Sequence, residues 1–392
     1  MITNKFSIRE QNEILVMTTI IHYPAISRAT ISQMTGLNKA STSQIVKKLV
    51  EDGLVLETGA GDTTAVGGRP PILLELNRDA GCSLSIDVGY DYLSSMLTNL
   101  NGEPLAETKE TGFLVTKENI LSKINNIILA HQPKFAEKTF QLIGITLAIH
   151  GIVHENQVLF TPYSNLDEMD LVAALEAEWD IPVTLENEAN LSVMGEKAFT
   201  TSRKNLISVS IHSGVGAGIL IDGELYRGSR GQGGEIGHMI LQAKGRSCPC
   251  GNRGCMEQYC SEFVLLKEYG LLTKKKEPTL IDIFLDYQKN DSEVVSLVHK
   301  VADYLAYGLN NLIAHFDTEL IILNSRIFDS LPFLIDLVKE RMVSNFAKNV
   351  PLLPSTLGNQ ATLFGGAVTN MQNFFHIKDL NFLQMDSDIL LP

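Results

Sequence analysis

The spacing of apolar residues changes along the chain. In residues 1–80, apolar side chains recur at helical intervals, and one stripe consists of Ile14, Leu15, Met17, Thr18 and Ile21. From residue 82 onward, short apolar runs typical of buried strands alternate with longer helical stretches. This pattern predicts an N-terminal helical domain followed by two α/β lobes.

Three helices and a hairpin are predicted in the N-terminal domain. Ser27 caps the second helix, and Gly36 ends it because glycine tolerates the left-handed conformation that follows a helix. A third helix covers about residues 39–52, and strands at 54–56 and 71–76 are joined by a glycine-rich segment. A helix, a glycine-containing turn and a second, polar helix indicate a helix-turn-helix, and the hairpin would be its wing.

The third helix of this head would enter the major groove of DNA. Ile45, Leu49 and Val50 are expected to face inward, and the small polar residues outward, where they can reach base edges. Basic side chains would contact phosphates. The expected DNA-binding residues are Arg28, Asn38, Lys39, Ser41, Thr42, Gln44, Lys47, Lys48 and Arg69. The alternative is a helical protein–protein module in which Lys47 and Lys48 are merely solvated.

The remaining chain is predicted to form two lobes with a cleft between them. The first has strands at 83–88, 93–97, 142–148 and 182–185 and helices near 117–131, 169–178 and 189–199. The second has strands at 206–211, 217–221 and 320–323, helices near 260–268 and 293–315, and terminal helices. The predicted domains are therefore 1–80, 81–200 and 201–392.

The composition of the chain excludes disordered and fibrous proteins. Apolar residues make up 44% and charged residues 20% of the 392 positions, which is typical of a globular protein. Residues 1–80 carry equal numbers of basic and acidic side chains, so the net charge of −13 lies in the lobes and leaves DNA binding open to the head. Residues 1–13 are polar and no stretch is long and apolar enough to span a membrane, so we expect a cytoplasmic protein.

Three of the five cysteines crowd into one short segment. Cys248, Cys250 and Cys255 lie in the sequence CPCGNRGC, and His238 precedes the first of them by ten residues. Three thiolates and an imidazole complete the four-coordinate shell of a structural zinc site. Gly251 and Gly254 would let the loop fold tightly around the ion. The alternative is a reactive or incidental cysteine cluster.

Several motifs together resemble the ROK family of repressors and sugar kinases. They include GGEIGH at 233–238, CPCGNRGCME at 248–257, DVG at 87–89, ENEAN at 186–190 and SGVGAG at 213–218. The resemblance covers nearly the whole chain. It implies a winged head followed by two actin/hexokinase-like lobes, with a sugar in the cleft and a structural zinc ion shaping one wall.

The resemblance also implies which residues bind the sugar. They are Asn165, Asn187, Glu188, Glu235, His238 and Glu257, with His238 serving as a zinc ligand as well. Carboxylates accept hydrogen bonds from sugar hydroxyls, and a metal-bound imidazole has a fixed orientation. In the alternative interpretation, Glu235 and Glu257 only brace the zinc loop.

Departures from the kinase motifs argue against phosphoryl transfer. ROK kinases have DxGGT at the first phosphate loop, where residues 87–91 of this chain read DVGYD. The glycine-rich adenosine loop is replaced by Asn324-Ser325-Arg326, and Glu188 stands where the kinases have a catalytic aspartate. Its longer side chain would misplace the carboxylate for proton abstraction. We therefore expect no enzymatic activity.

Within the family, the sequence most resembles the xylose repressors of Gram-positive bacteria. The segments ENEAN at 186–190, LFTPYSN at 159–165 and GLNKASTS at 36–43 carry this resemblance. It implies a repressor, as a homodimer or a dimer of dimers, that leaves a pseudo-palindromic operator when D-xylose binds. The alternatives are a sugar kinase with an appended DNA-binding head, and a repressor that responds to another monosaccharide such as glucose, to a phosphorylated sugar or to a protein.

Overall fold

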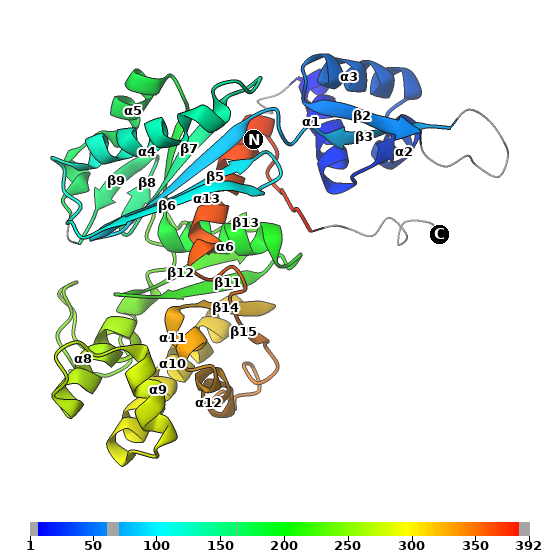
Figure 1. Ribbon diagram of the computed structural model, residues 1–392. Coiled ribbons are helices and arrows are strands. Elements are labelled where there is room, and N and C mark those ends of the chain that lie inside the picture. Colours follow the sequence, from blue (N-terminus) through cyan, green and yellow to red (C-terminus); the bar gives the residue numbers. More distant parts are fainter. Residues whose placement is uncertain (1–6, 61–69, 163, 384–392) are drawn as a thin grey trace. The chain divides into compact units, whose positions relative to one another are not determined.

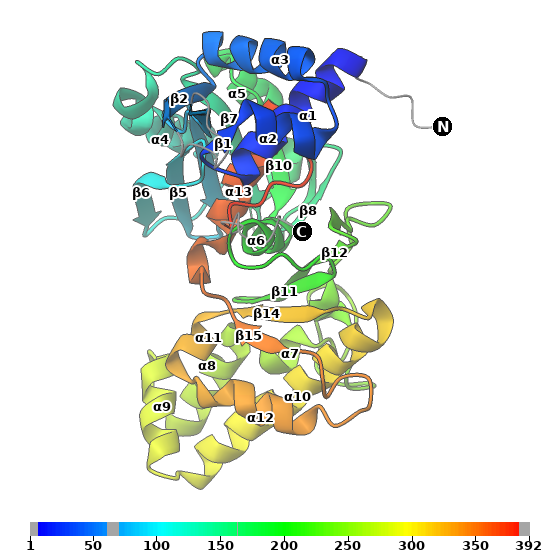
Figure 2. The ribbon, with the colours of Figure 1, turned by 90° about the vertical axis from the view of Figure 1, so that its right-hand side faces the viewer.

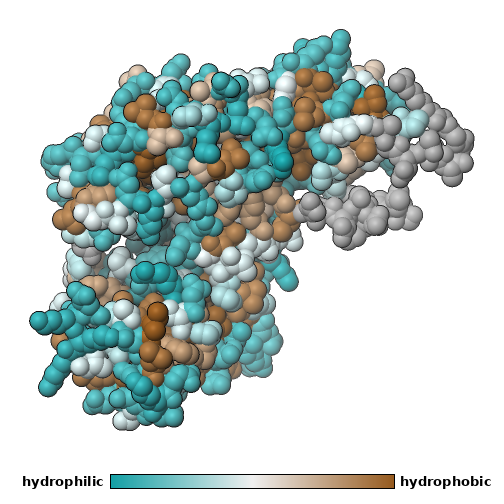
Figure 3. Space-filling view, in the orientation of Figure 1, coloured by the Kyte–Doolittle hydropathy of each residue, from teal (hydrophilic) through white to brown (hydrophobic). Residues whose placement is uncertain are grey.

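The structure is a computed structural model, which describes residues 7–60, 70–162 and 164–383 (Figure 1). Contacts between residues divide the chain into two compact units. Unit 1 comprises residues 1–151, 155–186 and 366–392, and unit 2 comprises 152–154 and 187–365. No helix in the described part combines the length and apolar character needed to cross a membrane. Hydrophilic residues cover much of the face that Figure 3 shows.

The N-terminal head forms part of unit 1. Its helices are α1 (Ile8–His22), α2 (Arg28–Thr35) and α3 (Lys39–Glu51). They pack on a three-stranded sheet in the order β1 (Ile26–Ser27), β3 (Ile72–Leu76) and β2 (Val55–Ala60). The described strands agree with a winged helix-turn-helix, whereas residues 61–69 of the predicted wing lie outside the described residues.

The ends of the head helices agree with the sequence prediction. Ser27 caps α2 by accepting a hydrogen bond from the Thr30 amide, and Gly36 ends it with φ +71°. Asn38 caps α3 through the Ser41 amide.

One part of the predicted α1 stripe is wrong. Leu15 is 41% exposed, whereas Val16 and Ile20 are buried. Helix α1 packs against α2, α3 and β3, and its buried residues are Val16, Met17, Thr19 and Ile20, of which only Met17 belongs to the predicted stripe.

The remainder of unit 1 is built on a five-stranded sheet. The strand order is β10 (Val183–Asn187), β7 (Leu142–Ile149), β4 (Cys82–Val88), β5 (Tyr92–Asn99) and β6 (Pro104–Thr111). Strands β4 and β7 are parallel, and β4, β5 and β6 are antiparallel. The smaller elements of unit 1 are β9 (Gln157–Phe160), η1 (Leu166–Glu168) and α5 (Leu171–Trp179), whereas β8 (Ile152–His154) is assigned to unit 2.

Helices cover both faces of this sheet. On one face, His131 of α4 (Ile120–Phe135) is hydrogen bonded to Ser95. On the other, Asn370 of α13 (Ala361–Phe375) accepts a hydrogen bond from Thr146 and donates one to Ser83. The C-terminal part of α13 therefore belongs to unit 1, although the sequence places residues 201–392 in one lobe.

Unit 2 has a second five-stranded sheet. The order is β13 (Glu224–Leu225), β12 (Val215–Ile221), β11 (Leu206–Ile211), β14 (Leu320–Asn324) and β15 (Leu352–Pro354). Its helices are α6 (Glu188–Phe199), η2 (Ile236–His238), α7 (Glu257–Cys260), α8 (Glu262–Thr273), α9 (Leu280–Gln288), α10 (Ser292–Phe316), α11 (Arg326–Ser330), α12 (Phe333–Arg341) and η3 (Gly358–Gln360).

Two apolar clusters hold unit 2 together. Val193 of α6 packs with Leu206 and Ile322 on one face of the sheet. On the other face, Val209 and Leu323 join the larger cluster that contains much of α10. Figure 2 shows α6 and α10 on opposite sides of β11 and β14. Strands that are buried on both faces have apolar residues at successive positions. The strands of this sheet could therefore be predicted from apolar runs in the sequence. The elements that were not predicted include β6, an edge strand with exposed and half-buried residues, and the short helix α9.

Candidate functional site

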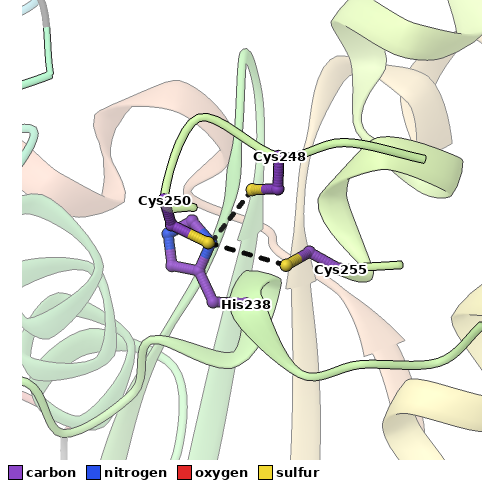
Figure 4. A group of neighbouring side chains, drawn as sticks. All are labelled: His238, Cys248, Cys250 and Cys255. Atoms are coloured by element: carbon purple, nitrogen blue, oxygen red, sulfur yellow. Dashed lines mark hydrogen bonds between the residues drawn. The ribbon is translucent and has the colours of Figure 1, made fainter. Parts of the chain in front are cut away.

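The structure brings the four predicted metal ligands together. One potential ligand atom each from His238, Cys248, Cys250 and Cys255 lies within 4.8 Å of all the others. Nδ1 of His238 is 3.6 Å from Sγ of Cys248, and the sulfurs of Cys250 and Cys255 are 3.7 Å apart. Figure 4 shows the four side chains pointing toward one another. This donor set could hold a tetrahedral metal ion.

The backbone of the cysteine loop explains its tight fold. Gly251 and Gly254 have φ of +93° and +88°, which L side chains rarely adopt. A Cβ atom at Gly254 would lie 1.8 Å from the carbonyl oxygen of Gln242. Cys255 is paired with Ile240 by an isolated β-bridge. Close backbone contacts therefore place the ligand that is farthest along the sequence next to the other three.

The thiols differ in their acidity. Burial raises the pKa of Cys248, and the nearby Glu257 carboxylate adds to the rise. Burial also raises the pKa of Cys255. At Cys250 burial acts in the same direction, but the hydrogen bond from the Asn252 amide and the neighbouring cysteines outweigh it and lower the pKa. A divalent cation would stabilise all three thiolates, so this chemistry fits a metal site.

Two carboxylates flank the imidazole of His238. Oε2 of Glu235 lies 3.7 Å from Nε2, and Oε1 of Glu257 lies 3.9 Å from Nδ1. Burial raises the pKa of Glu235, and Glu257 adds to the rise while His238 opposes it. If Nδ1 binds a metal, Nε2 must carry the proton and can donate a hydrogen bond. This arrangement presents acceptors and a donor side by side, which suits a polyhydroxylated ligand.

Asn187 and Glu188 lie at the start of α6. Oδ1 of Asn187 accepts hydrogen bonds from the amides of Ala189 and Asn190, so this atom caps the helix. Glu188 is the first residue of the helix, where a negative charge is favoured. The local sequence therefore fixes both residues through the helix end. Asn165 is exposed, has φ +50° and belongs to unit 1, whereas the other five predicted sugar ligands belong to unit 2.

The glycines before and within β12 lie against two of these carboxylates. A Cβ atom at Gly214 would be 3.3 Å from Oε2 of Glu257, and one at Gly216 would be 3.9 Å from Oε1 of Glu188. At Gly218 a Cβ atom would be only 2.2 Å from the carbonyl oxygen of Ala189. These glycines thus allow close packing within unit 2, a role that sequence reasoning did not identify.

The predicted DNA-binding residues of α3 differ in exposure. Lys39, Gln44, Lys47 and Lys48 are exposed, and Ser41 is half-buried. The expectation that Thr42 faces outward is wrong, because its side chain is fully buried and its hydroxyl donates to the carbonyl of Asn38. Sequence reasoning also overlooked Ser43, which is exposed. The helical period explains both errors, because one face of α3 packs against the other helices.

Among the described residues of the head, three of the predicted DNA-binding side chains form ion pairs. Arg28 contacts Glu57 and Lys48 contacts Glu13, in each case from a different element. Lys47 is 3.6 Å from Glu51, one turn along α3. Arg69 lies outside the described residues.

Comparison with known proteins identifies the family. The model described as "ROK family" matches residues 83–372. The chain belongs to the ROK family. A xylose repressor from Bacillus spizizenii is 35% identical to it over an alignment of 387 residues, which covers 96% of this chain and 99% of that protein.

Solved structures of ROK proteins share the fold. A ROK family transcriptional regulator, described as a homologue of the Escherichia coli MLC protein, covers 95% of this chain and 98% of its own, with TM-score 0.80 and 26% identity. A ROK family glucokinase from Streptomyces griseus covers 73% of this chain and 98% of its own, with TM-score 0.63 and 23% identity, and supports the fold alone. The predicted fold is confirmed: a winged helix-turn-helix precedes two actin/hexokinase-like lobes.

One polar cluster of this ROK protein was not predicted. Asp87, at the end of β4, accepts hydrogen bonds from the Tyr92 hydroxyl (2.8 Å) and from Nε2 of His150 (2.8 Å). A Cβ atom at Gly89 would meet the Tyr92 ring at 2.1 Å, so this ring covers the DVG turn. His150 directly follows β7, and the pairing of β7 with β4 places it beside Asp87.

Proposed function

We propose that this ROK protein is a transcriptional repressor that binds operator DNA through its head and releases it when a monosaccharide, D-xylose, binds. The observation that carries the proposal is the position of Glu235 and Glu257 on either side of His238, beside the cysteine cluster. The similarity to a named xylose repressor over 96% of the chain supports both the repressor role and the sugar.

In this proposal Glu235 and Glu257 accept hydrogen bonds from sugar hydroxyls, and His238 donates one through Nε2. Asn187, Glu188 and Asn165 supply further contacts. The Glu188 side chain is one methylene longer than aspartate, and we propose that it reaches the space left by the C6 hydroxymethyl group that a pentopyranose lacks.

We propose zinc as the metal and a structural role for it. His238, Cys248, Cys250 and Cys255 would hold it, and their nitrogen and sulfur donors are those that zinc prefers. When bound, the ion would neutralise the thiolates and orient the imidazole. The cysteine loop would then hold Glu257 and His238 at a fixed separation.

We further propose that the protein has no kinase activity. At the DVG turn, the Tyr92 ring covers Gly89, and Asp87 is engaged by His150 and Tyr92. Asn324 is the last residue of β14, and the hydroxyl of the next residue, Ser325, caps α11. We therefore do not expect the backbone at the DVG turn or at the start of α11 to bind a nucleotide phosphate.

A dimer, or a dimer of dimers, would place two α3 helices in successive major grooves of a pseudo-palindromic operator. We propose that it acts in the cytoplasm. Sugar binding would weaken this complex by favouring the conformation of the lobes that has lower affinity for DNA, with a coupling of about 1–3 kcal/mol.

Thermal unfolding against a panel of free pentoses and hexoses tests the proposal, because a ligand that binds only the folded protein raises its melting temperature. The expected result is a rise with xylose and little change with other sugars. Xylose should then release the protein from a duplex that it selects from a random library. A Glu257→Gln variant provides the control and should lose both responses. Sugar-dependent ADP release in a coupled assay, or selection of no duplex, would contradict the proposal.

A further inference from the structure

Two basic residues of the head are bound to acids on other elements. Nη2 of Arg28 is 2.5 Å from Oε1 of Glu57, and Nζ of Lys48 is 2.6 Å from Oε2 of Glu13. By contrast, Lys39 forms no ion pair with any residue that the structure describes. Within the described part of the head, Lys39 is therefore a free cation at the start of α3, whereas the positive charges of Arg28 and Lys48 are partly compensated.

The Arg28–Glu57 pair lies at the base of the described part of the wing. Arg28 is the first residue of α2 and directly follows β1, and Glu57 lies in β2. Ile26 and Glu57 are both in register with Leu74 of the central strand β3. The ion pair thus reaches across β3 and connects the start of α2 to the wing strand.

The start of α2 is a favourable place for a phosphate contact. Amide groups at a helix N-terminus favour anions, and phosphate contacts set the register of a protein on DNA. The side chain of Arg28 is 29% exposed, so its guanidinium reaches solvent while Nη2 is held by Glu57. Because guanidinium carries five N–H groups in one plane, it can keep one on a carboxylate and direct others at a phosphate.

Glu57 also reduces the net charge that Arg28 presents to DNA. Binding to arbitrary sequences depends almost entirely on phosphate neutralisation by cations. A carboxylate 2.5 Å from the guanidinium opposes this attraction. In a correctly registered complex, the same carboxylate fixes the direction of the guanidinium.

We propose that Glu57 is a specificity-determining positioning residue for DNA binding, an inference that rests on the proposed repressor function. It orients Arg28 toward one operator phosphate and weakens the attraction of Arg28 for DNA of other sequence. Glu57 therefore widens the difference in affinity between operator and arbitrary DNA.

The test compares wild type with Glu57→Gln on two duplexes over a series of salt concentrations. One duplex is selected by the wild-type protein from a random library, and the other has random sequence. We expect the variant to bind the random duplex more tightly, with a salt slope steeper by about 0.9, as for one more neutralised phosphate. The ratio of selected to random affinity should fall by roughly threefold to tenfold, as expected when one hydrogen bond to the selected duplex is no longer held in place.

Two further variants separate positioning from net charge. Asp52 is exposed and has no ion pair within the described part of the head, so Asp52→Asn changes the net charge equally without releasing a cation. It should leave the affinity ratio unchanged. Arg28→Lys keeps the charge but loses the planar group, and it should lower the ratio as Glu57→Gln does. Thermal unfolding verifies that each variant is folded.

An unchanged ratio in Glu57→Gln, or the same change in Asp52→Asn, would overturn the inference. If the wild-type protein selects no duplex at all, the proposed repressor function fails instead. The two failures are therefore distinguishable in one set of measurements.

Discussion

Sγ of Cys248 lies 3.0 Å from Oε1 of Glu257, so a predicted metal ligand contacts a predicted sugar ligand. Seven residues of the loop separate Cys248 from Met256, which directly precedes Glu257 and is fully buried. Met256 fits against Gly308 of α10, where a Cβ atom would be 2.5 Å from its sulfur. The cysteine loop and the carboxylate are therefore anchored at one point, and the proposed metal and sugar sites should respond together.

The first prediction concerns the metal. Replacing Cys250 with serine removes one of four ligands, so the purified variant should retain much less zinc than wild type. Loss of a structural ion that binds only the folded protein should lower the melting temperature by at least about 5 °C. Xylose should also stabilise the variant less. Metal analysis and thermal unfolding measure these effects, with Cys82→Ser, a buried cysteine outside the cluster, as the control for thiol loss. Full induction by xylose in metal-free Cys250→Ser would contradict the coupling.

The second prediction uses two neighbouring glycines. Gly214→Ala would place a methyl group 3.3 Å from Oε2 of Glu257, so the carboxylate must move. We expect xylose to bind this variant roughly three- to tenfold more weakly, since displaced hydrogen bonds to charged groups are costly. Gly216→Ala is the matched control, because its methyl group would be 3.5 Å from Ala189, an ordinary contact. Calorimetric titration that finds equal affinity for both variants would rule out the role of Gly214.

A third prediction tests which residues of α3 meet DNA. Gln44→Ala should relax base specificity, whereas Lys47→Ala should weaken binding to all sequences and reduce the salt slope. Thr42→Ala should lower stability without altering base preference, because Thr42 is buried. Binding measured on a set of single-base operator variants distinguishes these outcomes. An exchange of the Gln44 and Lys47 phenotypes would show that α3 is oriented differently on the groove.

The fourth prediction concerns the choice of sugar. Glu188→Asp shortens the side chain at the start of α6 and should reduce the preference for pentoses over hexoses. Calorimetry with xylose and glucose measures the ratio of the two affinities. If this ratio is the same in wild type and Glu188→Asp, the length of the Glu188 side chain does not determine the preference for pentoses.

A fifth prediction follows from Glu196, whose side chain is fully buried in unit 2. Burial raises its pKa above 4.5, although hydrogen bonds from Ser355 and Thr200 oppose the rise. A raised pKa in the folded state means that the folded protein holds this proton more tightly than the unfolded chain. The stabilisation is complete below about pH 4.5 and is lost as pH rises through the folded-state pKa.

Glu196→Gln removes this titration. The free energy of unfolding of wild type minus that of the variant should therefore decrease as pH rises above 4.5. Denaturant unfolding at several pH values measures the difference. A difference that stays constant with pH would show that Glu196 does not titrate in this way.

Local patterns predicted most elements because their causes are local. Ser27, Gly36 and Asn38 mark helix ends through hydrogen bonds and backbone angles within a few residues. The buried strands were readable from their apolar runs. The edge strand β6 was missed because its side chains alternate between exposed and half-buried, and nothing in its sequence distinguishes it from a loop.

In the candidate sites, too, short spacing made some features predictable, whereas contacts between distant residues were not. CPCGNRGC, with His238 ten residues earlier, was sufficient to predict a cluster of four ligands, since short spacing limits where the donors can lie. The pairing of Arg28 with Glu57 could not be predicted in this way, because 28 residues separate them in sequence and the sheet order brings them together. Thr42 was assigned to the wrong face because the inward side of α3 depends on α1 and α2.

Residue types and short spacings in the sequence were enough to predict the family, several helix ends, the buried strands and the four residues that cluster as potential metal ligands. These features depend on residue type and short spacing, which act through local sterics and burial. Three other features appear first in the folded chain: Asp87 contacts His150, Gly214 lies against Glu257, and α13 passes from unit 2 into unit 1. Such contacts join residues far apart in the chain, and their geometry is set by how strands pair and helices pack.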